Sequence, residues 1–170
     1  MADSKLSALS ALVGTGVDTA ADLLYIDDVS VTTSKKILVD ELRIALLSNT
    51  AITNSLSGDV ALNNTGNYFT GPTCAQGSTG TWFASGTVTL QDSVQAIFDV
   101  KLWDGTTVIA SAAVYVVGTE YVTVSLSGYL ASPAGNIRIS VKDISNTSGT
   151  IKFNASGESK DSTLSVIRIG

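Results

Sequence analysis

The sequence predicts a mainly β protein: an antiparallel β-sandwich of the jelly-roll type, preceded by an extended N-terminal arm with one short helix. Three observations lead to this prediction. The chain has 170 residues, which suits one compact domain with an appendage, and 44% of them are hydrophobic, enough for a core. The composition changes near residue 48. Beyond residue 67, Val, Ile, Thr, Ser and Gly dominate, and turn signals recur at short intervals.

Residues 1–47 form the predicted arm, which contains two short strands. Apolar side chains alternate along both strands, at positions Leu24, Ile26, Ile37 and Val39. Because Lys35 and Lys36 are charged, they suit an exposed strand edge.

A helix of about two turns is predicted at Asp40–Leu47, where Asp40 is a good N-cap and Leu42 and Leu46 share a face. So short a helix is not stable alone in water, and so small an arm cannot build its own core. We therefore expect the arm to dock on other chains.

Residues 48–67 are rich in Asn, Ser, Thr and Gly and are predicted to be a polar linker, which leaves residues 68–170 for the sandwich. Seven strands are predicted there, with an eighth at Tyr68–Thr70: Trp82–Leu90, Val94–Trp103, Thr106–Val117, Tyr121–Leu126, 137–142, 151–153 and 164–169.

The second of these strands shows the period of two that identifies a half-buried strand. Its apolar positions are Val94, Ala96, Phe98, Val100 and Leu102, and its other face carries Gln95, Asp99 and Lys101. Two antiparallel sheets packed face to face would bury such apolar faces. Strand counting does not separate a jelly roll from an immunoglobulin-like sandwich, but the absence of paired cysteines favours the jelly roll.

Composition argues against several functional classes. The net charge of −5 argues against binding to nucleic acid or to an anionic membrane surface. Since the chain has no histidine, a Ser-His-Asp or Cys-His system is impossible within it. Its single cysteine, Cys74, allows no intrachain disulfide and no thiolate metal site, and is expected to fill space in the core. No metal and no cofactor are expected.

Glycoside hydrolysis is the enzymatic alternative, because it needs a pair of carboxylates. The β region contains four carboxylates, Asp99, Asp104, Glu120 and Asp143. Asp104 and Glu120 lie at turns, so we predict that the protein is not an enzyme.

Trp103 precedes the Asp104-Gly105 turn, and three roles are open to it. It is a partly buried edge residue, a contact between subunits, or a platform on which a sugar stacks.

The N-terminal segment carries a pattern of its own. It opens with Ser-Lys-x-Ser-x-Leu at residues 4–9, continues with Asp-Leu-Leu-Tyr-Ile-Asp-Asp-Val-Ser at residues 22–30, and reaches the predicted helix through Thr-Ser-Lys-Lys-Ile-Leu-Val at residues 33–39. This pattern resembles the short N-terminal module of virion structural proteins of tailed bacteriophages. The resemblance covers about a quarter of the chain.

The resemblance implies a phage virion structural protein, found in the virion and made in the host cytoplasm. Two forms of it are expected: a capsid decoration, or cement, protein that stabilises the shell, and alternatively a small tail fibre or adaptor whose sandwich binds a host glycan. The expected partners are two further copies in a homotrimer and the major capsid protein or another virion protein. The expected oligomer and docking contacts are Leu24, Ile26, Ile37, Val39, Leu42, Leu46 and Trp103.

Overall fold

The computed structural model describes residues 23–26, 35–38 and 50–170, and the chain divides into two units, residues 1–48 and 49–170. In the first unit, strands β1 (Leu23–Ile26) and β2 (Lys35–Leu38) pair antiparallel, with Leu24 opposite Ile37. Both strands lie where the alternation of apolar residues predicted them. The predicted helix and the contact residues Val39, Leu42 and Leu46 lie outside the described residues.

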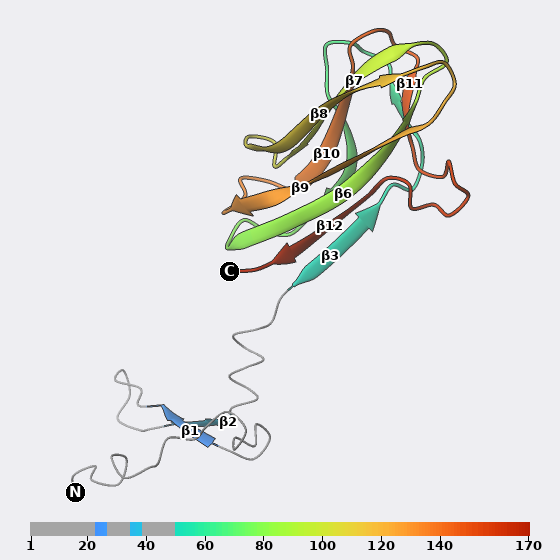
Figure 1. The fold of residues 1–170 in the computed structure, drawn as a ribbon. Coiled ribbons are helices and arrows are strands. Elements are labelled where there is room, and N and C mark those ends of the chain that lie inside the picture. The colour runs from blue at the N-terminus through green and yellow to red at the C-terminus, as the bar shows by residue number, and fades with distance from the viewer. Residues whose placement is uncertain (1–22, 27–34, 39–49) are drawn as a thin grey trace, which may run out of the picture. The chain divides into compact units, whose positions relative to one another are not determined.

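The second unit is an antiparallel β-sandwich (Figure 1), which confirms the predicted fold class. Its four-stranded sheet has the order β5 (Phe69–Cys74), β10 (Ile137–Asp143), β7 (Ala96–Trp103) and β8 (Val108–Val116). The larger sheet contains β3 (Ala51–Ser55), β12 (Thr163–Arg168), β6 (Thr81–Gln91), β11 (Gly149–Lys152), β4 (Val60–Leu62) and β9 (Val122–Ala131).

Strand β6 organises the larger sheet because it is 11 residues long and pairs along both of its edges. One edge pairs with β9 from Thr81 to Leu90. The opposite edge pairs first with β12, from Trp82 to Thr87, and then with β11, from Thr89 to Gln91. Strands β3, β12 and β6 run side by side in Figure 1.

The core lies between the two sheets and follows from the period of two. In β7, Phe98, Val100 and Leu102 are buried, while Asp99 and Lys101 are directed to the outer face and only half-buried. Ile137, Ile139 and Val141 of β10 are fully buried beside them. Cys74 is buried and forms no disulfide, as expected for a residue that fills core space. Its thiol donates to the carbonyl of Leu164 at 3.3 Å.

The predicted polar linker at residues 48–67 is wrong over much of its length, because β3 and β4 belong to the sandwich. Leu62 is fully buried, and Ile52 packs against the core. The polar side chains that suggested a linker instead pair across the exposed side of β3 and β12. Thr53 shares a hydrogen bond with Ser165, and Ser55 shares one with Thr163, each at 2.8 Å. Composition alone cannot separate such a strand from a linker.

Candidate functional site

The outer face of the four-stranded sheet gathers charged and aromatic side chains. Antiparallel pairing of β7 with β10 sets Trp103 opposite Arg138, Lys101 opposite Ser140 and Asp99 opposite Lys142. Since neighbouring strands lie about 4.8 Å apart, side chains on one face at paired positions touch. The register therefore brings three cations and an indole ring together.

Two aromatic rings hold these cations. The Lys101 Nζ atom lies 3.3 Å from the ring centroid of Trp103 and 3.9 Å from that of Tyr68. Arg138 lies over the Trp103 ring and Lys142 over the Tyr68 ring, each at 5.0 Å. The negative face of an aromatic ring attracts cations at such distances. We call Tyr68, Lys101, Trp103, Arg138 and Lys142 the cation–aromatic face.

Neighbouring groups fix two of its members. The indole nitrogen of Trp103 donates to the Ser140 hydroxyl at 2.9 Å, which orients the ring. The Arg138 guanidinium lies against Gly105, where a Cβ atom would collide with it, and Gly105 has a φ of 101°, a conformation that glycine adopts readily. The Nε atom of Arg138 is buried and has no hydrogen-bond partner among the described residues.

The cations of this face are brought together against their mutual repulsion. Burial lowers the pKa of Lys101, and the nearby charges of Arg138 and Lys142 lower it further. One carboxylate, Asp99, lies 3.4 Å from the Lys142 ammonium. Three positive charges thus meet one negative charge, although the whole chain has a net charge of −5. The face is a local positive patch on an acidic protein.

The sequence predicted part of this face. It placed Asp99 and Lys101 on the outer side of β7, and it singled out Trp103. Trp103 is half-buried, and cations lie over its ring. Sequence reasoning missed Tyr68, Arg138 and Lys142 as members of one site. Arg138 and Lys142 do alternate with buried residues, but only the register between β7 and β10 shows what they face.

A second polar cluster is a buried acidic pair at the other end of β10. Asp143 is fully buried and Asp92 nearly so. Asp143 Oδ1 accepts from the backbone amides of Ser145 and Asn146, and Asp92 Oδ1 accepts from the Ser148 hydroxyl at 2.6 Å. The Oδ2 atom of each aspartate is buried and has no hydrogen-bond partner within the described part of the chain, and the two carboxyl groups influence each other's pKa. Because two carboxylates in such contact resist being ionised together, the Asp92 carboxylate helps to raise the pKa of Asp143.

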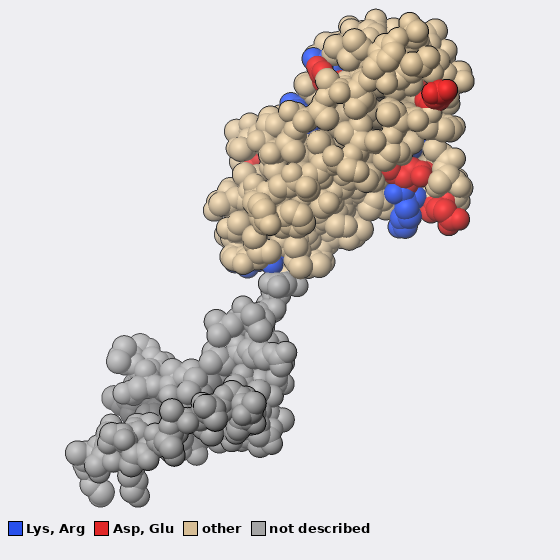
Figure 2. All heavy atoms as spheres, in the orientation of Figure 1, with Lys and Arg blue, Asp and Glu red and all other residues tan. Residues whose placement is uncertain are grey.

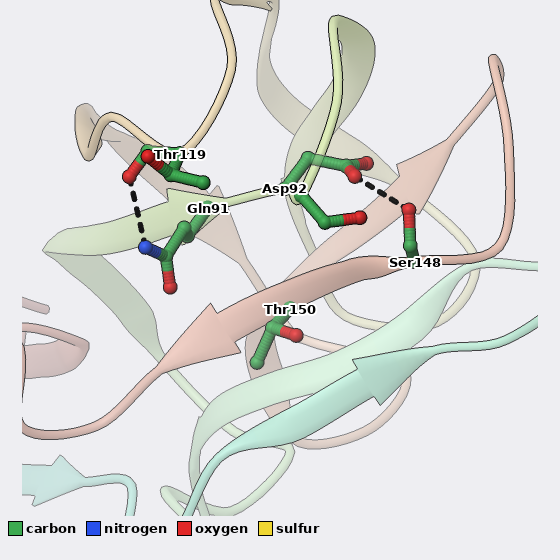
Figure 3. A pocket seen from close by; sticks show the side chains of 6 residues that line it. Gln91, Asp92, Thr119, Ser148 and Thr150 are labelled. Atoms are coloured by element: carbon green, nitrogen blue, oxygen red, sulfur yellow. Dashed lines mark hydrogen bonds between the residues drawn. The ribbon is translucent and has the colours of Figure 1, made fainter.

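The acidic pair borders a hollow of about 210 Å³. Figure 3 shows Asp92 and Ser148 joined by their hydrogen bond, with Gln91, Thr119 and Thr150 around the same space. Gln91 donates to the Thr119 carbonyl at 2.9 Å. Asp143 does not line the hollow. Of the carboxylates in the described residues, Asp92 therefore faces this space and Asp143 does not.

The acidic pair predicts a stability that depends on pH. Burial raises the pKa of Asp143, the amides of Ser145 and Asn146 oppose this rise, and the Asp92 carboxylate adds to it. Asp143 therefore contributes stability at acidic pH, and that contribution is lost as pH rises through its raised pKa. Asp143→Asn retains the acceptor oxygen and adds a permanent donor toward Asp92, so the variant should gain stability over the wild type as pH rises from the ordinary pKa of aspartate toward neutral pH.

Urea unfolding of both proteins across that pH range measures this difference. The other titratable groups are the same in both proteins, so their contributions cancel. The difference in the free energy of unfolding therefore reports on Asp92 and Asp143. A difference that stays constant across this range would contradict the raised pKa of Asp143.

The described ranges hold no group of three or more Cys, His, Asp or Glu side chains arranged to bind a metal ion. In the same part of the chain, no helix has the length and apolar character needed to cross a membrane.

Comparisons with known proteins show remote similarity only. No protein-family model matches the sequence, and neither does any curated protein. Among solved structures, the C-terminal CBM6 of LamC, a marine laminarinase from Zobellia galactanivorans, is 15% identical, with a TM-score of 0.38 over 70% of this chain and 100% of its own.

The infectious bursal disease virus VP2 subviral particle is 12% identical, with a TM-score of 0.37 over 88% of this chain and 38% of its own. The enzymatically active domain of tailspike protein 4 from bacteriophage CBA120 is 12% identical, with a TM-score of 0.24 over 72% of this chain and 19% of its own. The similar structures thus include a carbohydrate-binding module, a viral capsid protein and a phage tailspike. At these TM-scores the similarities do not distinguish one function from another.

Proposed function

We propose that the protein is a non-enzymatic structural component of a phage virion, and that it is a capsid decoration protein. Its N-terminal unit would attach to the major capsid protein, and its sandwich would extend from the shell. The observation that carries the proposal is the division of the chain into two units, residues 1–48 and 49–170. The resemblance to phage virion modules falls wholly within the first unit, and the sandwich forms a separate core.

The edge strands of the sandwich support the proposed association of copies in a homotrimer. Strands β8 and β9 contain no charged residue, although edge strands commonly carry charges that prevent pairing with other chains. The side chains of Tyr115 and Tyr129 are more than half exposed on them. Figure 2 shows a broad surface of the sandwich with few charged side chains. An uncharged, tyrosine-bearing surface suits contact with a second copy.

Deletion of residues 1–47 tests the anchoring role. We expect the remaining sandwich to fold, because its core lies within residues 49–170, but to be absent from purified particles. Particles without the protein should open at a lower temperature and still adsorb to cells, because a bound cement protein stabilises the assembled shell by mass action. Full occupancy by the truncated protein would contradict the anchor, and normal shell stability would contradict the cement role.

A second candidate function is a small tail fibre or adaptor that binds a host glycan. The cation–aromatic face favours it, because its lysine and arginine side chains place hydrogen-bond donors on an outer sheet face, where hydroxyl or acidic groups of a sugar can accept from them. Copy number separates the two candidates. Hundreds of copies per particle support capsid decoration, whereas a few dozen or fewer support the tail.

A further inference from the structure

We propose that the cation–aromatic face binds an acidic polysaccharide, through carboxylate or sulfate groups that reach Lys101, Arg138 and Lys142. This proposal rests on the second candidate function, glycan binding, and specifies the class of glycan. Within residues 50–170 there are six Lys and Arg residues, and three of them meet on this one face.

Charge is the first argument. The same residues 50–170 contain eight Asp and Glu, yet only Asp99 lies within ion-pair distance of the three cations in the described structure. Burial lowers the pKa of Lys101, and repulsion from Arg138 and Lys142 lowers it further; a bound anion would offset that repulsion.

The positions of the cations over the rings give the second argument. A neutral sugar would bind by stacking on Trp103, but Lys101 lies 3.3 Å from the centroid of that ring and Arg138 lies over it at 5.0 Å. The ring therefore orients the cations, which are the groups available to a ligand. Because Lys101 also lies over Tyr68, its ammonium is held in place before a ligand binds. Such preorganisation lowers the entropic cost of binding.

Spacing gives the third argument and favours an extended ligand. Arg138 and Lys142 are four positions apart on β10, a separation of about 13 Å along the strand. Thr70 of β5 and Ser111 of β8 border the face with short, exposed side chains, which leave it open on both sides. An oligosaccharide with repeated acidic groups can span this distance, and an open face admits an internal segment of a long chain.

A long nucleic acid fits the face less well. Its recognition needs a stripe of positive charge that follows the phosphate backbone. Here the positive patch is small and belongs to a chain with a net charge of −5, which repels a polyanion beyond the patch.

The test measures binding by the full chain in which Trp82→Phe leaves Trp103 as the remaining tryptophan. Trp82 is buried, with 3% exposure, so it would otherwise add a constant core signal to the fluorescence. The probes are alginate oligosaccharides, which carry carboxylates, sulfated dextran oligosaccharides, neutral dextran oligosaccharides, inorganic phosphate and an oligothymidylate. We expect Trp103 fluorescence to change with one or both acidic oligosaccharides and not with the other three probes.

Variants then locate the site. Lys101→Gln and Lys142→Gln should each weaken binding about tenfold or more, because a hydrogen bond to a charged group is lost. Lys160→Gln is the matched control: it removes the same charge from an exposed lysine near β12, where Lys160 contacts Ser55, and should leave affinity unchanged. Thermal unfolding of each variant checks that it folds. If a lysine variant fails to fold, the fluorescence response of the Trp82→Phe protein to the five probes still tests the proposal.

The outcomes separate this inference from the proposal on which it rests. Equal binding of neutral and acidic oligosaccharides would overturn the acidic class and leave glycan binding intact. Absence of binding to any oligosaccharide would overturn both the acidic class of ligand and the proposed glycan binding. Phosphate binding as tight as that of the oligosaccharides would reduce the face to a site for single anions, and equal binding of oligothymidylate would make it a general polyanion surface. A loss of affinity in Lys160→Gln equal to that in Lys142→Gln would place binding elsewhere.

Discussion

Replacing Phe98 with alanine is expected to lower the free energy of unfolding by about 3–5 kcal/mol. Phe98 is the largest fully buried side chain of the sandwich, and it lies under Gly149, whose missing side chain leaves room for the ring. Its removal takes an aromatic ring out of the core and leaves a cavity that the two paired sheets cannot close.

Ile97→Ala is the matched control, because Ile97 is the neighbour of Phe98 in β7 and is directed to the opposite face, with 40% exposure. It should cost less than about 1 kcal/mol. Urea unfolding of both variants measures the contrast. Similar losses in the two variants would mean that β7 does not present alternate residues to the core.

Replacing Asp104 with alanine is expected to destabilise the sandwich by about 3 kcal/mol or more, because three backbone amides lose a charged acceptor. Asp104 Oδ1 accepts from Thr106 and Thr107 at 2.8 and 2.6 Å, and Oδ2 accepts from Ala134 at 2.7 Å. Asp104 is nearly fully buried and ties the β7–β8 turn to the loop before β10.

The pH dependence of this variant has a definite sign. Burial raises the pKa of Asp104, but the amides of Thr107, Ala134 and Thr106 outweigh burial, so the pKa is lower in the folded protein. The contribution of Asp104 is therefore present above the ordinary pKa of aspartate and is lost as pH falls through the lowered value. The difference in unfolding free energy between wild type and Asp104→Ala should shrink as pH falls below about 4. A difference that is unchanged there would contradict the charged acceptor.

The sandwich could be predicted because apolar and polar residues alternate so regularly within its strands. The period of two in β7 identified Phe98, Val100 and Leu102 as core and Asp99 and Lys101 as outer residues. The same period predicts Val94 on the buried face, but β7 begins at Ala96 and Val94 is 52% exposed. Strand ends are set by turn hydrogen bonds, such as that from Val94 to Asp92, and these leave no periodic signal.

The candidate site could be predicted only in part, because register is a property of pairs of strands. Nothing local to Lys101 indicates that Ser140 lies opposite it, or that the ring of Tyr68 covers it. The acidic pair escaped prediction for the same reason. Asp92 and Asp143 are 51 positions apart, and in the sequence Asp143 is one of several scattered carboxylates. The fold brings these two aspartates into contact, and no local pattern in the sequence indicates it.

The pairing of β3 with β12 has a consequence for how the chain reaches its native state. Thr53 and Ser165, which share a hydrogen bond across these strands, are 112 positions apart, and β12 also completes one edge of β6. A ribosome must therefore release nearly the whole sandwich before its larger sheet can close. Pairings between such distant segments make folding slow, and until β12 arrives, β3 and β6 expose unpaired backbone. The nascent chain should be most prone to aggregation in that interval, and a protein stalled before Thr163 should be insoluble rather than partly folded.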